Sequence, residues 1–168
     1  MEPIALPPHL EARCRWLTRP TEAPRFIVYW LRTAVRAHEN PALDVALTLG
    51  DAWDVPVFVH HALSESYPFA SDRHHTFILE GARELRGAMR ARGVGYAFHL
   101  ERPGHRGPVL KTLAQDAGLV VTEEMPVPPL RGWTRALAEV VPVLSVDTSC
   151  VVPMPLTGRA PERAFRFT

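Results

Sequence analysis

Short apolar runs alternate with amphipathic stretches along this sequence, and this alternation constrains the fold more than any other feature. Runs rich in β-branched and aromatic residues predict strands over 25–30, 55–61, 94–100, 119–124 and 142–147. Stretches with apolar residues at helical spacing predict helices over 41–53, 73–93, 109–118 and 131–141. Strands that alternate with helices favour a parallel sheet. We therefore predict an α/β fold, a Rossmann-like open sheet of five mostly parallel strands with helices on both faces.

The two ends of the chain lack the regular alternation of apolar and amphipathic segments found in its middle. Residues 1–24 are proline-rich, and we interpret them as an N-terminal arm packed on the main body. A short helix is predicted over His9 to Leu17, because apolar residues there fall on one face. Residues 25–153 form the predicted α/β domain. Residues 154–168 are irregular and contain no predicted element.

Size and charge exclude several classes of protein. The 168 residues suit one globular domain. The 19 basic and 18 acidic residues give a formal net charge of +1, so the chain as a whole has no electrostatic attraction to nucleic acid. The two cysteines, Cys14 and Cys150, are far apart and are interpreted as reduced thiols. No apolar run reaches the roughly 20 residues that a bilayer requires, and no signal peptide is apparent, so we expect a cytoplasmic protein with no membrane contact.

The fold class predicts where a ligand would bind. In open α/β sheets, ligands bind outside the carboxyl ends of the strands, near the point where the strand order reverses. Aromatic and polar side chains at these ends could converge on an anion or an aromatic ligand. The candidate binding residues are Trp30, Arg32, Arg36, Asn40, His60 and Glu101.

Each type of candidate has a simpler interpretation. Arg32 and Arg36 would share a face if the loop over 32–40 were helical, and could then hold a phosphate or pair with carboxylates. The adjacent pair Glu123 and Glu124 could be a paired-acid site or simply solvated. Adjacent histidines such as His60–His61 point to opposite faces of a strand, and no metal-binding motif accompanies them, so we predict no metal site.

Motifs for chemistry are absent from the sequence. It contains no GxSxG, HExxH, GxGxxG or GxxxxGK[ST] pattern. The loop PGHRG over 103–107 is interpreted as a turn rather than a phosphate loop. We therefore assign no catalytic residue to this chain, and pattern alone leads no further than an α/β domain with a ligand-binding edge.

Specific residues carry a resemblance to a known family. The segment YWLRTAVRAHENPAL over 29–43 resembles the first strand–loop–helix of the DNA photolyase/cryptochrome family, and is most similar to class II cyclobutane pyrimidine dimer photolyases. Thr33 and Ala34 depart from that segment, where the family has an Arg-Asp pair. Three further segments resemble the family in the right order: DRHHTFILEGAREL over 72–85, VVTEEMPVPPLR over 120–131 and SVDTSCVVP over 145–153.

The resemblance implies a fold and a set of partners. In the family, the N-terminal α/β domain is joined by a connector to a larger helical domain, which binds FAD and receives the flipped pyrimidine dimer. Some members hold a deazaflavin or folate antenna chromophore in the α/β domain. The resemblance implies that residues 154–168 begin the connector, that the helical FAD-binding domain lies in the same or another chain, and that DNA is contacted only through that domain.

Two functions follow as hypotheses. The first is the antenna-type α/β domain of a deoxyribodipyrimidine photolyase-like protein, a carbon–carbon lyase whose catalytic FAD domain has no counterpart in these 168 residues. The alternative is a stand-alone nucleotide- or chromophore-binding module without repair activity. The ligand bound by the chain and its native molecular mass would discriminate between them.

Overall fold

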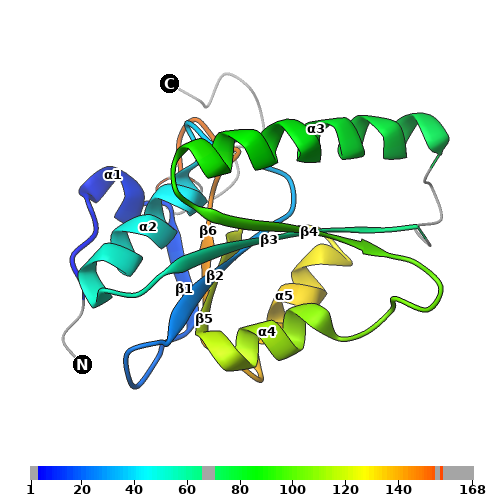
Figure 1. Cartoon of the computed structure of the whole chain (residues 1–168). Coiled ribbons are helices and arrows are strands. Elements are labelled where there is room, and N and C mark those ends of the chain that lie inside the picture. The colour runs from blue at the N-terminus through cyan, green and yellow to red at the C-terminus, as the bar shows by residue number, and fades with distance from the viewer. Residues whose placement is uncertain (1–3, 66–70, 154–155, 157–168) are drawn as a thin grey trace, which may run out of the picture.

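The computed structural model describes residues 4–65, 71–153 and 156, and shows a six-stranded sheet between two layers of helices (Figure 1). The strand order is β1-β6-β5-β2-β3-β4. All neighbouring strands are parallel except β1 and β6. The strands are β1 (Cys14–Thr18), β2 (Phe26–Leu31), β3 (Val57–Ser64), β4 (Gly95–Glu101), β5 (Gly118–Glu123) and β6 (Val143–Val146).

Helices cover both faces of the sheet, as predicted. They are α1 (Pro8–Glu11), α2 (Pro41–Trp53), α3 (Asp72–Ala91), α4 (Val109–Ala117) and α5 (Leu130–Ala138). Residues of α2 and α3 pack on one face in a core that includes Tyr29 and Val59. Residues of α4 and α5 pack on the other face in a second core that includes Val28 and Val120. Figure 1 shows α3 on one side of the sheet and α4 and α5 on the opposite side.

The N-terminal segment differs from the prediction. The helix predicted over His9 to Leu17 is wrong, because α1 ends at Glu11 and β1 follows it. β1 pairs with β6 in antiparallel register, so the sheet has six strands rather than the expected five. Trp16 of this strand packs against the first core and Leu17 against the second. Burial on both faces of the sheet therefore stabilises this segment as a strand.

Local signals in the sequence fix where two helices begin. The Ser71 side chain accepts a hydrogen bond from the backbone N–H of His74 at 3.3 Å and caps α3, as serine commonly does at a helix start. Asn40 caps α2, because its Oδ1 accepts from the N–H of Leu43 at 3.2 Å. Pro41 follows in the first turn of α2, where its missing N–H is not needed.

The topology places one crevice between β2 and β5. The chain runs outward from β2 through β3 to β4, then returns to the other side of β2 to form β5 and β6. The strand order therefore reverses between the carboxyl ends of β2 and β5. This is where open α/β sheets bind ligands, and the residues around it are the first place to look for a site.

Candidate functional site

A buried glutamate fills the crevice between β2 and β5. Glu123, the last residue of β5, has no exposed surface. Its carboxylate accepts hydrogen bonds from the Tyr29 hydroxyl at 2.7 Å and from the backbone N–H of Arg32 at 3.1 Å. The N–H and Oγ1 of Thr33 donate to it at 2.7 and 2.9 Å. The donors that could receive an external anion at this crevice are therefore bound to an internal carboxylate.

Tyr29 and Asn40 extend this buried cluster. The Nδ2 of Asn40 donates to the Tyr29 hydroxyl at 3.1 Å and to the carbonyl oxygens of Ala34 and Arg36 at 3.0 Å each. Burial, and then the neighbouring Glu123 charge, raise the pKa of Tyr29 well above its ordinary value, so the phenol stays protonated. Every polar group of Asn40 is thus used within the chain. We name Tyr29, Asn40, Glu123 and the backbone of Arg32 and Thr33 the Glu123 cluster.

The predicted arginines are also held internally. Arg32 donates to the main-chain oxygen of Glu123 and, at 3.1 Å, to Oγ1 of Thr134. Burial lowers the pKa of Arg32, while the charges of Glu123 and Glu124 oppose this shift. Arg36 donates to the carbonyl oxygens of Glu39 at 2.9 Å and Thr148 at 3.3 Å. The segment over 32–40 is a loop rather than a helix, so the condition under which the two arginines would share a helical face is not met.

The neighbouring acidic residue has a separate role. Glu124 accepts from Arg15 at 2.6 and 2.7 Å and from the Ser145 hydroxyl at 2.5 Å. Glu123 and Glu124 therefore neither form a paired-acid site nor lie solvated at the strand end. Each binds a different set of donors within the fold.

An open pocket lies on the other face of the sheet, between α4 and α5. It has a volume of about 460 Å³, and Trp30 and Trp133 both line it. The Arg32 guanidinium lies over the Trp30 ring, 4.4 Å from its centroid. Lys111, in the first turns of α4, lines the pocket beside Pro108, and no side chain caps that helix start. Trp133 is 51% exposed, so this pocket, unlike the Glu123 cluster, has aromatic surface available to a ligand.

The histidines of β3 lie on opposite faces of the sheet. His60 is next to Trp30 in register, is 3% exposed and stacks on His99 with centroids 6.2 Å apart. Burial, with smaller contributions from His99 and His61, lowers the pKa of His60 to about 4. His61 is bonded through Nδ1 to the Tyr96 hydroxyl at 3.0 Å, and burial lowers its pKa to about 4 as well. Both rings are therefore neutral at physiological pH.

The six predicted residues do not converge on one ligand. Trp30, with Arg32 over its ring, lies at the pocket between α4 and α5, and His60 is beside Trp30 on the same face. Asn40 belongs to the Glu123 cluster, and the Arg36 guanidinium is hydrogen-bonded to main-chain oxygens of the protein. Glu101 ends the outer strand β4, and its carbonyl accepts from the N–H of Glu65 at 3.2 Å.

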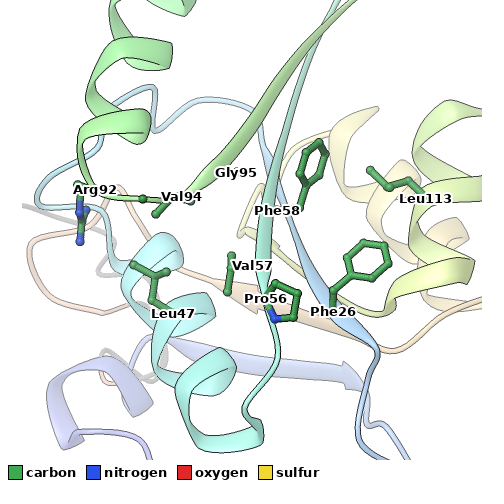
Figure 2. Close-up of a pocket in the computed structure, with 10 residues that line it drawn as sticks. Phe26, Leu47, Pro56, Val57, Phe58, Arg92, Val94, Gly95 and Leu113 are labelled. Atoms are coloured by element: carbon green, nitrogen blue, oxygen red, sulfur yellow. The ribbon is translucent and has the colours of Figure 1, made fainter.

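A second cavity of about 560 Å³ lies at the amino ends of β2 to β4, away from these residues. Figure 2 shows Phe26, Phe58 and Leu113 on one side of β3 and Leu47 and Val57 on the other. Arg92 is its only charged lining residue, and that guanidinium already donates to the carbonyl of Ala37. This cavity lacks polar groups that converge on one point.

Sequence reasoning missed several residues of this region. Tyr29 was considered only as part of a strand, although alternation along β2 places it on the face opposite Trp30. Trp133 and Lys111 have no motif around them, and only the packing of α4 and α5 brings them to Trp30. Because Trp133 shares a helix face with the apolar residues Leu130 and Leu137, the sequence alone does not distinguish it from a core tryptophan.

Comparison with known proteins identifies the family. A sequence model of the DNA photolyase family matches residues 27–166. The chain belongs to the DNA photolyase family. A deoxyribodipyrimidine photo-lyase of Methanothermobacter thermautotrophicus is 30% identical over 131 residues, which cover 77% of this chain and 29% of the relative. The chain therefore spans less than a third of the length of that photo-lyase.

Solved structures agree on the fold. A class III photolyase from Agrobacterium tumefaciens matches with a TM-score of 0.59 at 18% identity, over 78% of this chain and 27% of that photolyase. A putative universal stress protein from Pseudomonas aeruginosa matches with a TM-score of 0.53 at 13% identity, over 80% of this chain and 52% of that protein. At such identities the likeness concerns the fold alone. The fold is that of the photolyase N-terminal α/β domain.

The described residues contain neither a metal-binding cluster nor a membrane-spanning helix. Residues 4–65, 71–153 and 156 contain no group of three or more histidine, cysteine, aspartate or glutamate side chains that could hold a metal ion. Over the same residues, no helix combines the length and apolar character needed to cross a membrane. The predicted connector over 154–168 falls outside the described residues, apart from Leu156.

Proposed function

We propose that this chain is the antenna-type α/β part of a class II-like photolyase that repairs pyrimidine dimers in DNA using light. The observation that carries the proposal is the match to the DNA photolyase family over residues 27–166, with a photo-lyase more than three times as long as the matched region. On this proposal, a helical FAD-binding part, in the same or another chain, binds the DNA and performs the reaction. The class II assignment rests on the sequence resemblance over 29–43.

Within this function, the pocket between α4 and α5 is the proposed antenna site. The indole rings of Trp30 and Trp133 offer apolar faces to a planar chromophore such as a deazaflavin or a folate. Lys111 and the uncapped start of α4 offer positive charge to an anionic arm of that molecule. Trp30 and Arg32 are thereby retained from the predicted ligand residues, with His60 beside them. Arg36, Asn40 and Glu101 act in the fold instead.

The alternative, a stand-alone nucleotide-binding module, has weaker support. Nucleotides in this fold place phosphates against backbone N–H groups at the point where the strand order reverses. Here the N–H groups of Arg32 and Thr33 already bind the Glu123 carboxylate. A nucleotide phosphate would have to displace a buried carboxylate of the same charge.

Photoreactivation tests the proposal. Source cells carrying an in-frame deletion of residues 25–153 should lose light-dependent survival after ultraviolet irradiation, while survival in the dark stays unchanged. Equal light-dependent recovery with and without the deletion would overturn the proposal. An immunoblot against this domain shows whether the helical part belongs to the same polypeptide. A band well above 18.8 kDa would mean that it does, and a band at 18.8 kDa would mean that it belongs to a separate polypeptide.

The antenna site has its own test. The chain is titrated with a folate and with a deazaflavin, and binding is followed by absorbance and by tryptophan fluorescence. Trp133→Ala should abolish binding of the chromophore that the chain takes. The matched control is Phe77→Ala, which removes an aromatic side chain that is 76% exposed on α3, outside the pocket. If Trp133→Ala leaves chromophore binding unchanged, the pocket between α4 and α5 is not the antenna site.

A further inference from the structure

The two edges of the sheet are built differently. β1 has five residues, carries Arg15 as its second residue and has an irregular register between Trp16 and Thr18. β4 has seven residues, and all seven pair with β3 in unbroken register. It contains no proline or bulge, and its only charge is at its last residue, Glu101. Natural sheets protect their edges with short strands, charges, prolines or bulges. β1 has such protection and β4 does not.

The outer side of β4 presents a regular row of main-chain groups. The carbonyl oxygen of Glu101 accepts a hydrogen bond from the backbone N–H of Glu65, so the main-chain groups of Glu101 point toward the β3 side. Because successive residues of a strand direct their N–H and C=O groups to opposite sides, Tyr96, Phe98 and Leu100 direct theirs outward. Among the described residues, no strand pairs with this side of β4. Gly95 has no side chain, Ala97 has only a methyl group, and both residues are exposed, so neither blocks an approaching strand.

A stripe of arginines runs along α3, the helix that packs over β4. Arg83, Arg86 and Arg90 are spaced i, i+3 and i+7, so they fall on one side of the helix. All three are exposed, and none forms an ion pair with a described residue. Glu80 and Glu84 lie further round the solvent side of the helix. We name these three residues the α3 arginine stripe.

Contacts of α3 place this stripe beside the open edge. The buried residues Ala82, Leu85 and Met89 define the side of α3 that faces the sheet. Gly81, on one flank of that side, lies next to Val35 of the loop that follows β2, with a Cβ position 3.9 Å from the Val35 side chain. At about 100° per residue, Arg86 lies on the opposite flank, toward the outer edge. Its charge also acts on Tyr96 of β4, opposing the rise in the pKa of that phenol that burial causes.

We propose that the outer edge of β4 and the α3 arginine stripe together bind an extended acidic peptide segment, which adds to the sheet as a further strand. The main chain of β4 would supply the hydrogen bonds, and the arginines would select acidic side chains on the face below α3. This inference is independent of the proposed repair function.

Charge distinguishes this partner from two others. A second copy of the chain that paired antiparallel through β4 would bring its own arginine stripe next to the first, so like charges oppose self-association through this edge. A nucleic acid could bind the arginines, but it has no row of main-chain donors and acceptors to pair with β4. An acidic strand uses both features.

Amide hydrogen exchange provides the test. The ¹⁵N-labelled 168-residue chain is mixed with the capped peptide Thr-Glu-Val-Glu-Val-Glu-Thr, and exchange is followed residue by residue by NMR. We expect the amides of Tyr96, Phe98 and Leu100 to exchange at least about tenfold more slowly with the peptide, because they become hydrogen-bonded. The amides of Ala97 and His99 bond to β3 already and should change little. A peptide with Lys in place of Glu is the control and should not protect these amides.

Two variants test separately how the β4 main chain and the arginine charges contribute to peptide binding. Leu100→Pro removes one outward N–H without touching the ladder to β3, and should weaken peptide binding. R83E/R86E/R90E reverses the stripe and should weaken binding at least about tenfold. R25E/R131E/R135E is the matched control, because it reverses three exposed arginines away from β4 and α3, and should bind as the unmodified chain does after correction for net charge. Circular dichroism confirms that each variant is folded.

Each result decides the proposal. Alternating protection of the three outward amides, lost in the stripe variant but not in its control, supports it. If the same amides are protected without peptide, and this protection grows with protein concentration, the partner of β4 is a second copy of the chain and the peptide proposal is overturned. Binding of a DNA duplex by the stripe without protection of the β4 amides, or no protection with any probe, would overturn the proposal.

Discussion

Two consecutive residues of β2, Tyr29 and Trp30, lie in environments that differ in almost every respect. Tyr29 has no exposed surface, and its hydroxyl is bonded to Glu123 and Asn40. Trp30, one position later, points to the other face and lines an open pocket of about 460 Å³. The first environment consists of polar groups whose hydrogen bonds are satisfied within the chain. The second consists of aromatic surface and positive charge that the chain leaves uncovered.

This difference shows how to separate structural from functional polar residues at a ligand-binding edge. A side chain whose donors and acceptors are all used within the fold has nothing left to offer a ligand, however suggestive its position. Asn40 and Glu123 are of this kind. Trp30 and Trp133 instead present uncovered aromatic surface to the pocket, and of the two only Trp30 was predicted from the sequence. The following predictions test how far the two environments can be changed separately.

Mild acid should weaken both environments at once, with the largest effect. His60 lies on the Trp30 side and His61 on the Glu123 side, and the pKa of each is lowered from 6.5 to about 4. Because the unfolded chain takes up these protons below pH 6.5 and the folded chain does so only near pH 4, stability is fully present above pH 6.5 and is lost as the pH falls from there. At pH 5 the loss is about 2 kcal/mol per histidine.

Urea unfolding at pH 7 and pH 5 measures this loss. The chain with His60→Phe should show a shallower decline than the unmodified chain, because one of the two proton-binding sites is gone. A free energy of unfolding that stays constant between pH 7 and pH 5 would contradict the buried, neutral state of both rings.

Glu123→Gln should disrupt the closed environment alone. The amide nitrogen would face the N–H groups of Arg32 and Thr33, so donors now bound to a carboxylate would lose their acceptor. We expect the free energy of unfolding to fall by about 3 kcal/mol. Glu124→Gln is the matched control: its partner Arg15 is half exposed, and the loss should be about 1 kcal/mol. Equal losses in the two variants would show that the Glu123 cluster is no special feature.

Asn40→Ala should have a smaller effect on the same environment. It removes the cap of α2 and the bond to Tyr29, while Glu123 keeps its other donors. A loss of about 1–2 kcal/mol is expected by thermal or urea unfolding. Asn40→Ser retains an uncharged capping oxygen and should recover the capping part of this loss, unless the cap contributes nothing.

Trp133→Ala should change stability least, because the side chain is half exposed at the rim of the open pocket. We expect a change in the free energy of unfolding within about 0.5 kcal/mol. Combined with the loss of chromophore binding proposed above, this would separate function from stability. A loss as large as that of Glu123→Gln would instead identify Trp133 as a core residue.

Most of the fold was accessible from the sequence, because its signals are local. The periodicity over 41–53 predicted α2 with both of its ends, and Ser71, a favourable capping residue, marks the start of α3. β1 was missed because nothing near residues 14–18 marks them as a strand. Their partner is β6, close to the other end of the sequence, and only that pairing makes them extended.

The candidate site was predicted less well, for a related reason. Asn40 precedes Pro41 and an apolar periodic run, so its role as a helix cap was available from local rules. Glu123 was different: its donors come from Tyr29 and the Arg32–Thr33 backbone, and no local pattern indicates that a glutamate will be buried by them. Trp133 gained its importance only when α5 packed beside α4. Site residues defined by such contacts cannot be found from spacing.

The pairing of β1 with β6 has a consequence for the order of events during synthesis. Residues 14–18 leave the ribosome before the other described strands, and their partner, residues 143–146, leaves after them. The chain is extended at about 5–20 residues per second, so β1 waits for many seconds without a neighbour. Throughout that interval its apolar side chains, Trp16 and Leu17, are available to chaperones or to other nascent chains. The sheet is complete only when β6, the last described strand to be synthesised, pairs with β1, the first.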